Sequence, residues 1–210
     1  MSKFFEPFWQ SEFSEHISVA ERTQIVMQEP FMELLGACAR SVTEGGKVMF
    51  CGNGGSASDS QHLATELTAR YKTDRAAIAS IALTTDTSAL TAIGNDFGFE
   101  HLFSRQVEAL GKSGDVLIGI STSGNSANVI KAMEMAQSMG ITTVGFTGET
   151  GGEMVSVCDV ILKVPSKTTA RIQEMHITLG QMLCGALEQY LGLTAEEHTM
   201  ECFQNAQKVA

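Results

Sequence analysis

Five short apolar runs recur along the chain, with polar or helical stretches between them. In the two clearest runs nearly every residue is apolar, as in Val48-Met49-Phe50-Cys51 and Val116-Leu117-Ile118. Runs of this kind are typical of parallel strands that helices cover on both faces, because neither face of the strand meets water. The pattern predicts an α/β fold whose five-stranded parallel sheet is flanked by helices, with strands near residues 47–51, 79–83, 115–120, 141–146 and 159–163.

Apolar residues at helical spacing mark helices at both ends of the chain. The first helix covers about residues 4–27, and a second begins near Pro30. The last covers about residues 171–191, and Gly192 ends it. The aromatic-rich first helix carries more apolar surface than a peripheral helix needs, so we expect it and the last helix to pack between subunits. Packing against the chain's own sheet is the alternative.

Length and composition fit one core with additions at its ends. The chain has 210 residues, of which 43% are hydrophobic, and that is enough to bury a single sizeable core. We divide it into an N-terminal helical oligomerisation segment (1–44), a ligand-binding α/β domain (45–192) and a polar tail (193–210).

Charge and cysteine content indicate which binding partners the protein can have and in which cellular compartment it occurs. The net charge is −10 and no basic run occurs, so direct nucleic-acid binding is disfavoured. No stretch resembles a signal peptide or approaches 18 consecutive apolar residues, as a membrane span would require. The five cysteines are widely spaced and lie mostly in apolar runs, which is typical of reduced, packed thiols. We therefore expect a cytoplasmic protein with no membrane partner.

Two of the apolar runs break into loops of small residues that each open a helix. Gly52-Asn53-Gly54-Gly55-Ser56 follows the first strand, and Ser121-Thr122-Ser123-Gly124-Asn125-Ser126 follows the third. Small residues let the backbone approach a ligand, and the free N–H groups at a helix N-terminus favour an anion. The hydroxyls suit a phosphate monoester such as a sugar phosphate, although ordinary strand–helix turns with capping serines would look similar. Because both loops leave the carboxyl ends of strands, one site can use both.

Several polar residues could carry chemistry beside these loops. His62 and Glu66 are four residues apart, so on a helix they point the same way. Such a pair can bind a divalent metal or place a carboxylate base beside a sugar carbon, but it could also be a solvent-facing hydrogen bond. Asn95 and Asp96 stand in a turn-rich stretch and could bind sugar hydroxyls or only form the turn. Gln173 is either a helix surface residue or a side chain that enters a neighbour's site.

Together these segments resemble the sugar isomerase (SIS) domain family, and most closely its D-sedoheptulose 7-phosphate isomerases. The resemblance covers about residues 45–190 and is carried by the segments at 51–56, 61–67, 94–99, 120–126 and 171–176. It implies a homotetramer with active sites between subunits. The implied reaction converts sedoheptulose 7-phosphate to D-glycero-D-manno-heptose 7-phosphate through an enediolate, a step toward the heptose of lipopolysaccharide.

The resemblance also implies a role for each matching residue. The residues that would hold the phosphate or nearby substrate atoms are Ser56, Ser121, Thr122, Ser123 and Ser126. The residues that would line the sugar are Asn53, Gly54, Gly55, Asn95 and Asp96. Glu66 would be the base, and the zinc ligands would be His62, Glu66 and Gln173, the last also meeting substrate.

One catalytic position departs from the family pattern. Where the isomerases of the family carry a histidine that binds zinc and donates a proton, this chain has Gln181. An amide does not titrate and is a weaker zinc ligand than imidazole. Gln173 and Gln181 are eight residues apart, about 12 Å along a helix, so both could meet one metal only if Gln173 precedes the helix or a second subunit contributes. His176 or His101 could replace the donor.

The same departure leaves two other functions open. A sibling in the family, the DnaA initiator-associating protein, also lacks that histidine and acts as a tetrameric scaffold for the replication initiator. Gln181 favours this function, whereas Glu66 with Gly54-Gly55 favours the enzymes. A sugar-phosphate sensor without turnover is a third possibility.

Overall fold

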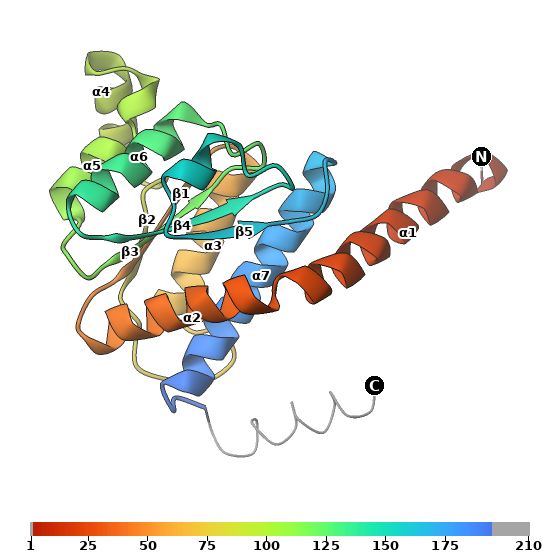
Figure 1. Ribbon diagram of the computed structural model, residues 1–210, viewed down its shortest axis with the longest axis horizontal. Helices are drawn as coiled ribbons and strands as arrows, with labels where there is room; N and C mark the ends of the chain where they lie inside the picture. The colour runs from red at the N-terminus through yellow and green to blue at the C-terminus, as the bar shows by residue number, and fades with distance from the viewer. Residues whose placement is uncertain (1, 195–210) are drawn as a thin grey trace.

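The computed structural model describes residues 2–194, which form one parallel sheet between two layers of helices (Figure 1). The strand order is β2-β1-β3-β4-β5, and every neighbouring pair is parallel. The strand bounds are β1 Val48–Gly52, β2 Ser80–Ala82, β3 Val116–Ile120, β4 Thr142–Thr147 and β5 Val160–Lys163. The predicted fold class and all five strands are confirmed, with bounds that differ by at most one residue. Of the expected tail, 195–210 lie outside the described residues.

Helices cover both faces of the sheet. One face packs on α2 (Gln28–Thr43), α3 (Gly55–Thr68) and α7 (Thr169–Tyr190) through Val48, Phe50 and other buried residues. The opposite face packs on α5 (Ser104–Leu110) and α6 (Ala127–Ser138) through a second buried cluster. All residues of β1 and β3 are buried, which is why these strands are continuous apolar runs. The remaining short helices are α4 (Thr87–Asp96), η1 (Phe99–His101) and η2 (Gly152–Ser156).

Successive strands are added toward one side of the sheet from β1 and toward the other side from β3, so the topological switch point lies between β1 and β3. From β1 the chain moves outward to β2, then crosses to β3 and continues to β4 and β5 on the other side. The loops that follow β1 and β3 therefore leave the same edge at adjacent positions, where open α/β sheets form their ligand sites. These are the two glycine- and serine-rich loops.

Helix α1 (Ser2–Val26) projects away from the body of the molecule (Figure 1). Met27 is buried and separates it from α2, which begins at Gln28, two residues before the expected start at Pro30. Pro30 lies in the first turn of α2, where its missing N–H costs no helical hydrogen bond. Large apolar side chains of α1 are more than half exposed in the chain by itself, among them Phe8, Trp9, Phe13 and Ile17.

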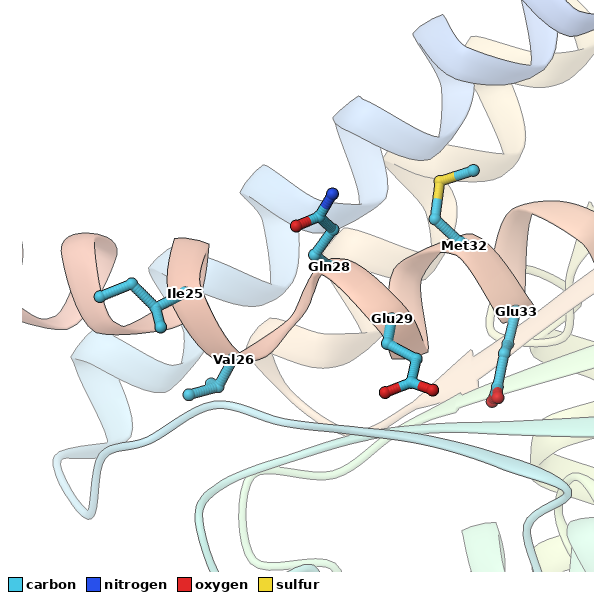
Figure 2. A pocket seen from close by; sticks show the side chains of 6 residues that line it. All are labelled: Ile25, Val26, Gln28, Glu29, Met32 and Glu33. Atoms are coloured by element: carbon cyan, nitrogen blue, oxygen red, sulfur yellow. The ribbon is translucent and has the colours of Figure 1, made fainter. Parts of the chain in front are cut away.

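The junction of α1 and α2 carries a further exposed apolar group. Ile25 is 78% exposed and Met32 is 57% exposed. They line an open pocket together with Val26, Gln28, Glu29 and Glu33 (Figure 2). Among the helices in the described part of the chain, none is both long and apolar enough to cross a membrane.

His176, which faces the core from α7, makes a testable contribution to stability. It is completely buried, its Nε2–H donates to the Thr147 carbonyl at 3.1 Å, and burial lowers its pKa to about 4. In the unfolded chain the imidazole takes up a proton below about pH 6.5, whereas the folded chain resists protonation down to about pH 4. The free energy of unfolding should therefore fall as the pH drops from 6.5 toward 4, by about 2 kcal/mol at pH 5.

Urea denaturation at pH 7.5 and pH 5 of the native chain and of His176→Gln measures this contribution. The amide of His176→Gln can still donate to Thr147 but does not titrate. We expect the loss of stability between the two pH values to be smaller in the variant. An equal loss in both proteins would contradict the assignment.

Candidate active site

Gly52 allows the start of the loop after β1 to lie close to the end of β3. Gly52 pairs with Ile120 of β3. A side chain at Gly52 would meet the Ile120 carbonyl oxygen at 2.9 Å and Ser56 Cβ at 2.7 Å. Gly54 adopts a φ of +55°, and α3 begins at the next residue. The absence of a side chain at Gly52 thus brings the N-terminus of α3, with the buried Ser56 in its first turn, against the end of β3.

The loop after β3 gathers hydroxyl groups at the N-terminus of α6. Ser121 Oγ lies 2.9 Å from Ser126 Oγ and 3.5 Å from Ser123 Oγ. Ser123 Oγ also accepts a hydrogen bond from the Asn125 backbone N–H at 3.1 Å. Ser126 is the N-cap residue of α6, and its side chain does not cap the helix. The cluster therefore keeps hydroxyls beside free helix N–H groups, an arrangement that suits a phosphate.

A pair of amides joins the first loop to α6. Asn53 and Asn128 donate to each other's side-chain oxygens, both at 2.9 Å. Asn128 is buried at the start of α6, among residues of an apolar face. No motif in the sequence singled out Asn128. Its only signal is a polar residue in an apolar helix face, and its partner lies 75 positions away.

Helices α3 and α7 bring together His62, Glu66 and Gln181. His62 Nε2 lies 3.2 Å from Glu66 Oε1 and 3.3 Å from the Gln181 side-chain nitrogen. The helices approach closely here because Gly180 has no side chain, and one would overlap Leu63. The Glu66 side chain is 19% exposed and that of His62 is 47% exposed, so both are accessible from solvent. An accessible carboxylate beside an imidazole, on the helix that follows a loop able to bind phosphate, can transfer protons at a sugar phosphate.

Gln173, the third predicted zinc ligand, lies near one end of α3, away from His62 and Glu66. Gln173 lies within α7, and its side-chain nitrogen would be 2.5 Å from a Cβ at Gly55. Gly55 is seven residues before His62, about 10 Å along α3. Because Gln173 does not precede the helix, it can share one metal with Gln181 only through a second subunit. Its assignment as a zinc ligand stays a prediction.

Asn95 and Asp96 end α4, which lies far from α7 (Figure 1). Asn95 donates to Asp96 Oδ1 at 2.7 Å, and both residues are exposed. Their contact with sugar stays a prediction. His101 lies in η1, 3.8 Å from Glu100, and His176 is enclosed in the core against Thr147. Among the described residues, neither histidine forms a hydrogen bond or ion pair with Glu66.

The donor atoms fit a metal only in part. Within residues 2–194 no three His, Cys, Asp or Glu side chains come together as a metal site. Tetrahedral zinc with bonds of about 2.0–2.1 Å places its ligand atoms roughly 3.3 Å apart. The separations of 3.2 and 3.3 Å around His62 match that spacing, provided that Gln181 turns its amide oxygen inward. His62 and Glu66 are thus good zinc donors, and Gln181 is a weak one.

Comparison with known proteins identifies the class to which this fold and site belong. A family profile described as "SIS domain" matches residues 12–148. The chain therefore belongs to the SIS domain family, as its sequence motifs predict.

Within that family its relatives are phosphoheptose isomerases. The enzyme of that name from Paramagnetospirillum magneticum is 53% identical over 184 residues, which cover 88% of this chain and 96% of the relative. The one from Rhodospirillum rubrum is 57% identical over 159 residues, covering 76% and 85%. The solved phosphoheptose isomerase of Neisseria gonorrhoeae superposes with a TM-score of 0.84 at 44% identity, covering 88% of this chain and 99% of that one.

Proposed function

We propose that the protein isomerises D-sedoheptulose 7-phosphate to D-glycero-D-manno-heptose 7-phosphate, a precursor of lipopolysaccharide heptose, in the cytoplasm. The observation that carries this proposal is the position of Glu66 beside His62, on the helix that opens from the first phosphate loop. The high identity to phosphoheptose isomerases over most of the chain supports the same reaction.

The two loops hold the phosphate end of the substrate. Ser56 and the hydroxyl cluster of Ser121, Ser123 and Ser126 surround adjacent helix N-termini, and Thr122 lies in the same loop. Hydroxyl and backbone N–H donors can surround the three outer oxygens of a monoester without a bound cation. The sugar then extends past Asn53, Gly54 and Gly55 toward the middle of α3.

Glu66 acts as the general base. Its carboxylate takes a proton from the hydroxymethyl carbon next to the ketone, and the electron pair of that C–H bond forms the C=C bond of an enediolate. A proton returned to the former carbonyl carbon, together with transfer of the neighbouring hydroxyl proton to the former ketone oxygen, gives the aldose. Gln181 cannot supply that proton because an amide does not titrate. We assign the proton return to the His62–Glu66 pair.

His62 and Glu66 would hold a zinc ion, with Gln181 or Gln173 of one subunit or another supplying amide oxygen. Bound zinc would stabilise negative charge that develops on the substrate oxygens. Without metal, Gln181 orients His62 through their 3.3 Å contact.

Replacing Gln181 with histidine should strengthen metal binding. Imidazole is a better zinc donor than an amide oxygen, so Gln181→His should raise zinc affinity on the order of tenfold or more in isothermal titration calorimetry. Gln189→His, on an exposed position of the same helix, is the matched control and should leave zinc affinity unchanged. Equal zinc affinities of Gln181→His and the native chain would show that the side chain at position 181 does not bind the metal.

A homotetramer that uses α1 at its subunit contacts belongs to the same proposal. The exposed aromatic residues of α1 support it, because apolar surface of this kind is usually covered in an assembly. Sedimentation equilibrium tests it, and Trp9→Glu should shift the protein toward smaller species.

A non-catalytic scaffold for the replication initiator is the competing function, favoured by Gln181 in place of the family histidine. A pull-down with the amino-terminal domain of the initiator distinguishes it from the enzyme. Capture at micromolar concentration without isomerase activity would support the scaffold.

An isomerase assay with sedoheptulose 7-phosphate tests the proposed activity directly. The purified protein should produce D-glycero-D-manno-heptose 7-phosphate, and a parallel assay with a chelator measures how far the rate depends on metal. No turnover with added zinc would overturn the proposal.

A further inference from the structure

A buried ion pair lies behind the proposed base. Arg75 Nε donates to Glu188 Oε1 at 2.9 Å, and the side chains of Arg75 and Glu188 are only 2% and 1% exposed. Glu188 also accepts hydrogen bonds from the backbone N–H groups of Tyr71 at 3.1 Å and Lys72 at 3.3 Å. These donors offset the cost of burying the Glu188 carboxylate, and together they fix its position.

The same arginine holds the end of the helix that carries Glu66. Arg75 Nη2 donates to the Glu66 backbone carbonyl at 2.8 Å, and Nη1 donates to the Leu67 carbonyl at 2.7 Å. Carbonyls in the last turn of a helix have no partner within the helix, so their orientation depends on such outside donors. The planar guanidinium can bind both carbonyls and Glu188 together, which a lysine cannot do.

Glu188 connects this helix end to α7. It lies seven residues after Gln181, two turns along one helix face. That face also carries Gly180, packed on Leu63, and Cys184, whose thiol lies 4.0 Å from the Leu63 carbonyl. The ion pair therefore joins the turn of α3 that bears Glu66 to the helix that bears Gln181.

We propose that Arg75 and Glu188 are positioning residues for the Glu66 base, an inference that rests on the proposed isomerase function. They fix the Glu66 backbone and thereby the separation of its carboxylate from His62 and from the bound sugar. A displacement of about 1 Å at a reacting group can cost on the order of a hundredfold in rate. Loss of this pair should reduce the chemical step more than substrate binding, because both phosphate loops lie at the other end of α3.

Kinetics of Arg75→Lys and Glu188→Gln test the proposal. We expect kcat to fall on the order of tenfold to a hundredfold, with KM changed by less than about threefold. Asp115→Asn is the matched control, because it removes the buried charge of the Lys47–Asp115 ion pair, which precedes β1 and β3 at the opposite edge of the sheet. This variant should lose stability but keep kcat. Native kcat in both test variants would overturn the proposal.

A double-mutant cycle separates positioning from general structural support. In a Glu66→Gln background, Arg75→Lys should cause no further loss of the residual rate, because no base remains to be positioned. If the two losses multiply, Arg75 acts independently of Glu66 and the proposal is wrong.

The ring resonances of His62 give a measurement that needs no turnover. They report on the carboxylate 3.2 Å away, so Glu66→Gln defines the shift caused by losing it. Arg75→Lys should move these resonances in the same direction, and Asp115→Asn should leave them in place. Unmoved resonances in Arg75→Lys would refute positioning even if the native protein proved inactive, whereas inactivity of the native protein alone would refute only the isomerase function.

Discussion

Glu66→Gln should abolish most of the isomerase activity while leaving the protein folded. The substitution keeps the size and polarity of the side chain but removes its capacity to accept a proton. General base catalysis typically contributes 10²–10⁴-fold, so we expect kcat to fall by roughly that factor. Steady-state assays with sedoheptulose 7-phosphate give the loss, and KM should change little because the phosphate loops are untouched.

A control variant and a stability measurement test whether the loss of activity comes from the missing carboxylate of Glu66. Glu134→Gln, at an exposed position of α6, makes the same chemical change away from the site and should retain full activity. Thermal denaturation of Glu66→Gln should match the native protein within a few degrees. If Glu66→Gln kept a native kcat, another group would be the base and the proposed mechanism would fail.

Gly124→Ala should have the largest effect on the phosphate loops. Gly124 has a φ of +69°, and a Cβ there would overlap the Gly151 carbonyl. The backbone conformation alone costs an alanine about 1–2 kcal/mol, and overlap with a neighbouring backbone adds about 1–3 kcal/mol. We expect the free energy of unfolding to fall by about 2–5 kcal/mol, the sum of these two costs, as measured by urea denaturation.

The same substitution should weaken substrate binding. The Gly124 N–H donates to the Ser121 carbonyl and the Gly124 carbonyl accepts from Met154, both at 3.0 Å, so movement of Gly124 shifts the hydroxyl cluster. We expect a KM increase of at least about tenfold, with a smaller change in kcat.

Gly45→Ala is the matched control for Gly124→Ala. Gly45 has a φ of +82°, a side chain at this position would have no neighbour within 4 Å, and the residue precedes β1 at the opposite edge of the sheet. It should show only the conformational cost, about 1–2 kcal/mol, and a native KM. Equal effects of the two substitutions would mean that the contact with Gly151 is unimportant.

The sequence predicted the strands and the two loops because each depends on local pattern. Strands buried on both faces must be apolar throughout, as β1 and β3 are. Loops that approach a ligand must use small residues, so the Gly/Ser segments stand out along the chain. The pairing of His62 with Glu66 followed from helical spacing alone, and their 3.2 Å contact confirms it.

Residues that act across the fold were not predictable in this way. Arg75 and Glu188 are 113 positions apart, and each looks in sequence like an ordinary surface charge. Asn53 was expected near the sugar, but its link to Asn128 depends on how the first loop meets α6. The surroundings of two polar residues of α7 were also undetermined by the sequence: the structure puts Gln173 against Gly55 and encloses His176 in the core.

The amino-acid sequence by itself determined the α/β class and the positions of the two glycine- and serine-rich loops, and it singled out His62 and Glu66, because these follow from burial patterns and local spacing. The tertiary structure decided how α3 and α7 are paired. That pairing brings Gln181 to His62, places Gln173 against Gly55 and sets the buried Arg75–Glu188 ion pair at the end of α3 that carries Glu66. Contacts between helices depend on close approach at single positions such as Gly180, which no periodicity along one segment can encode.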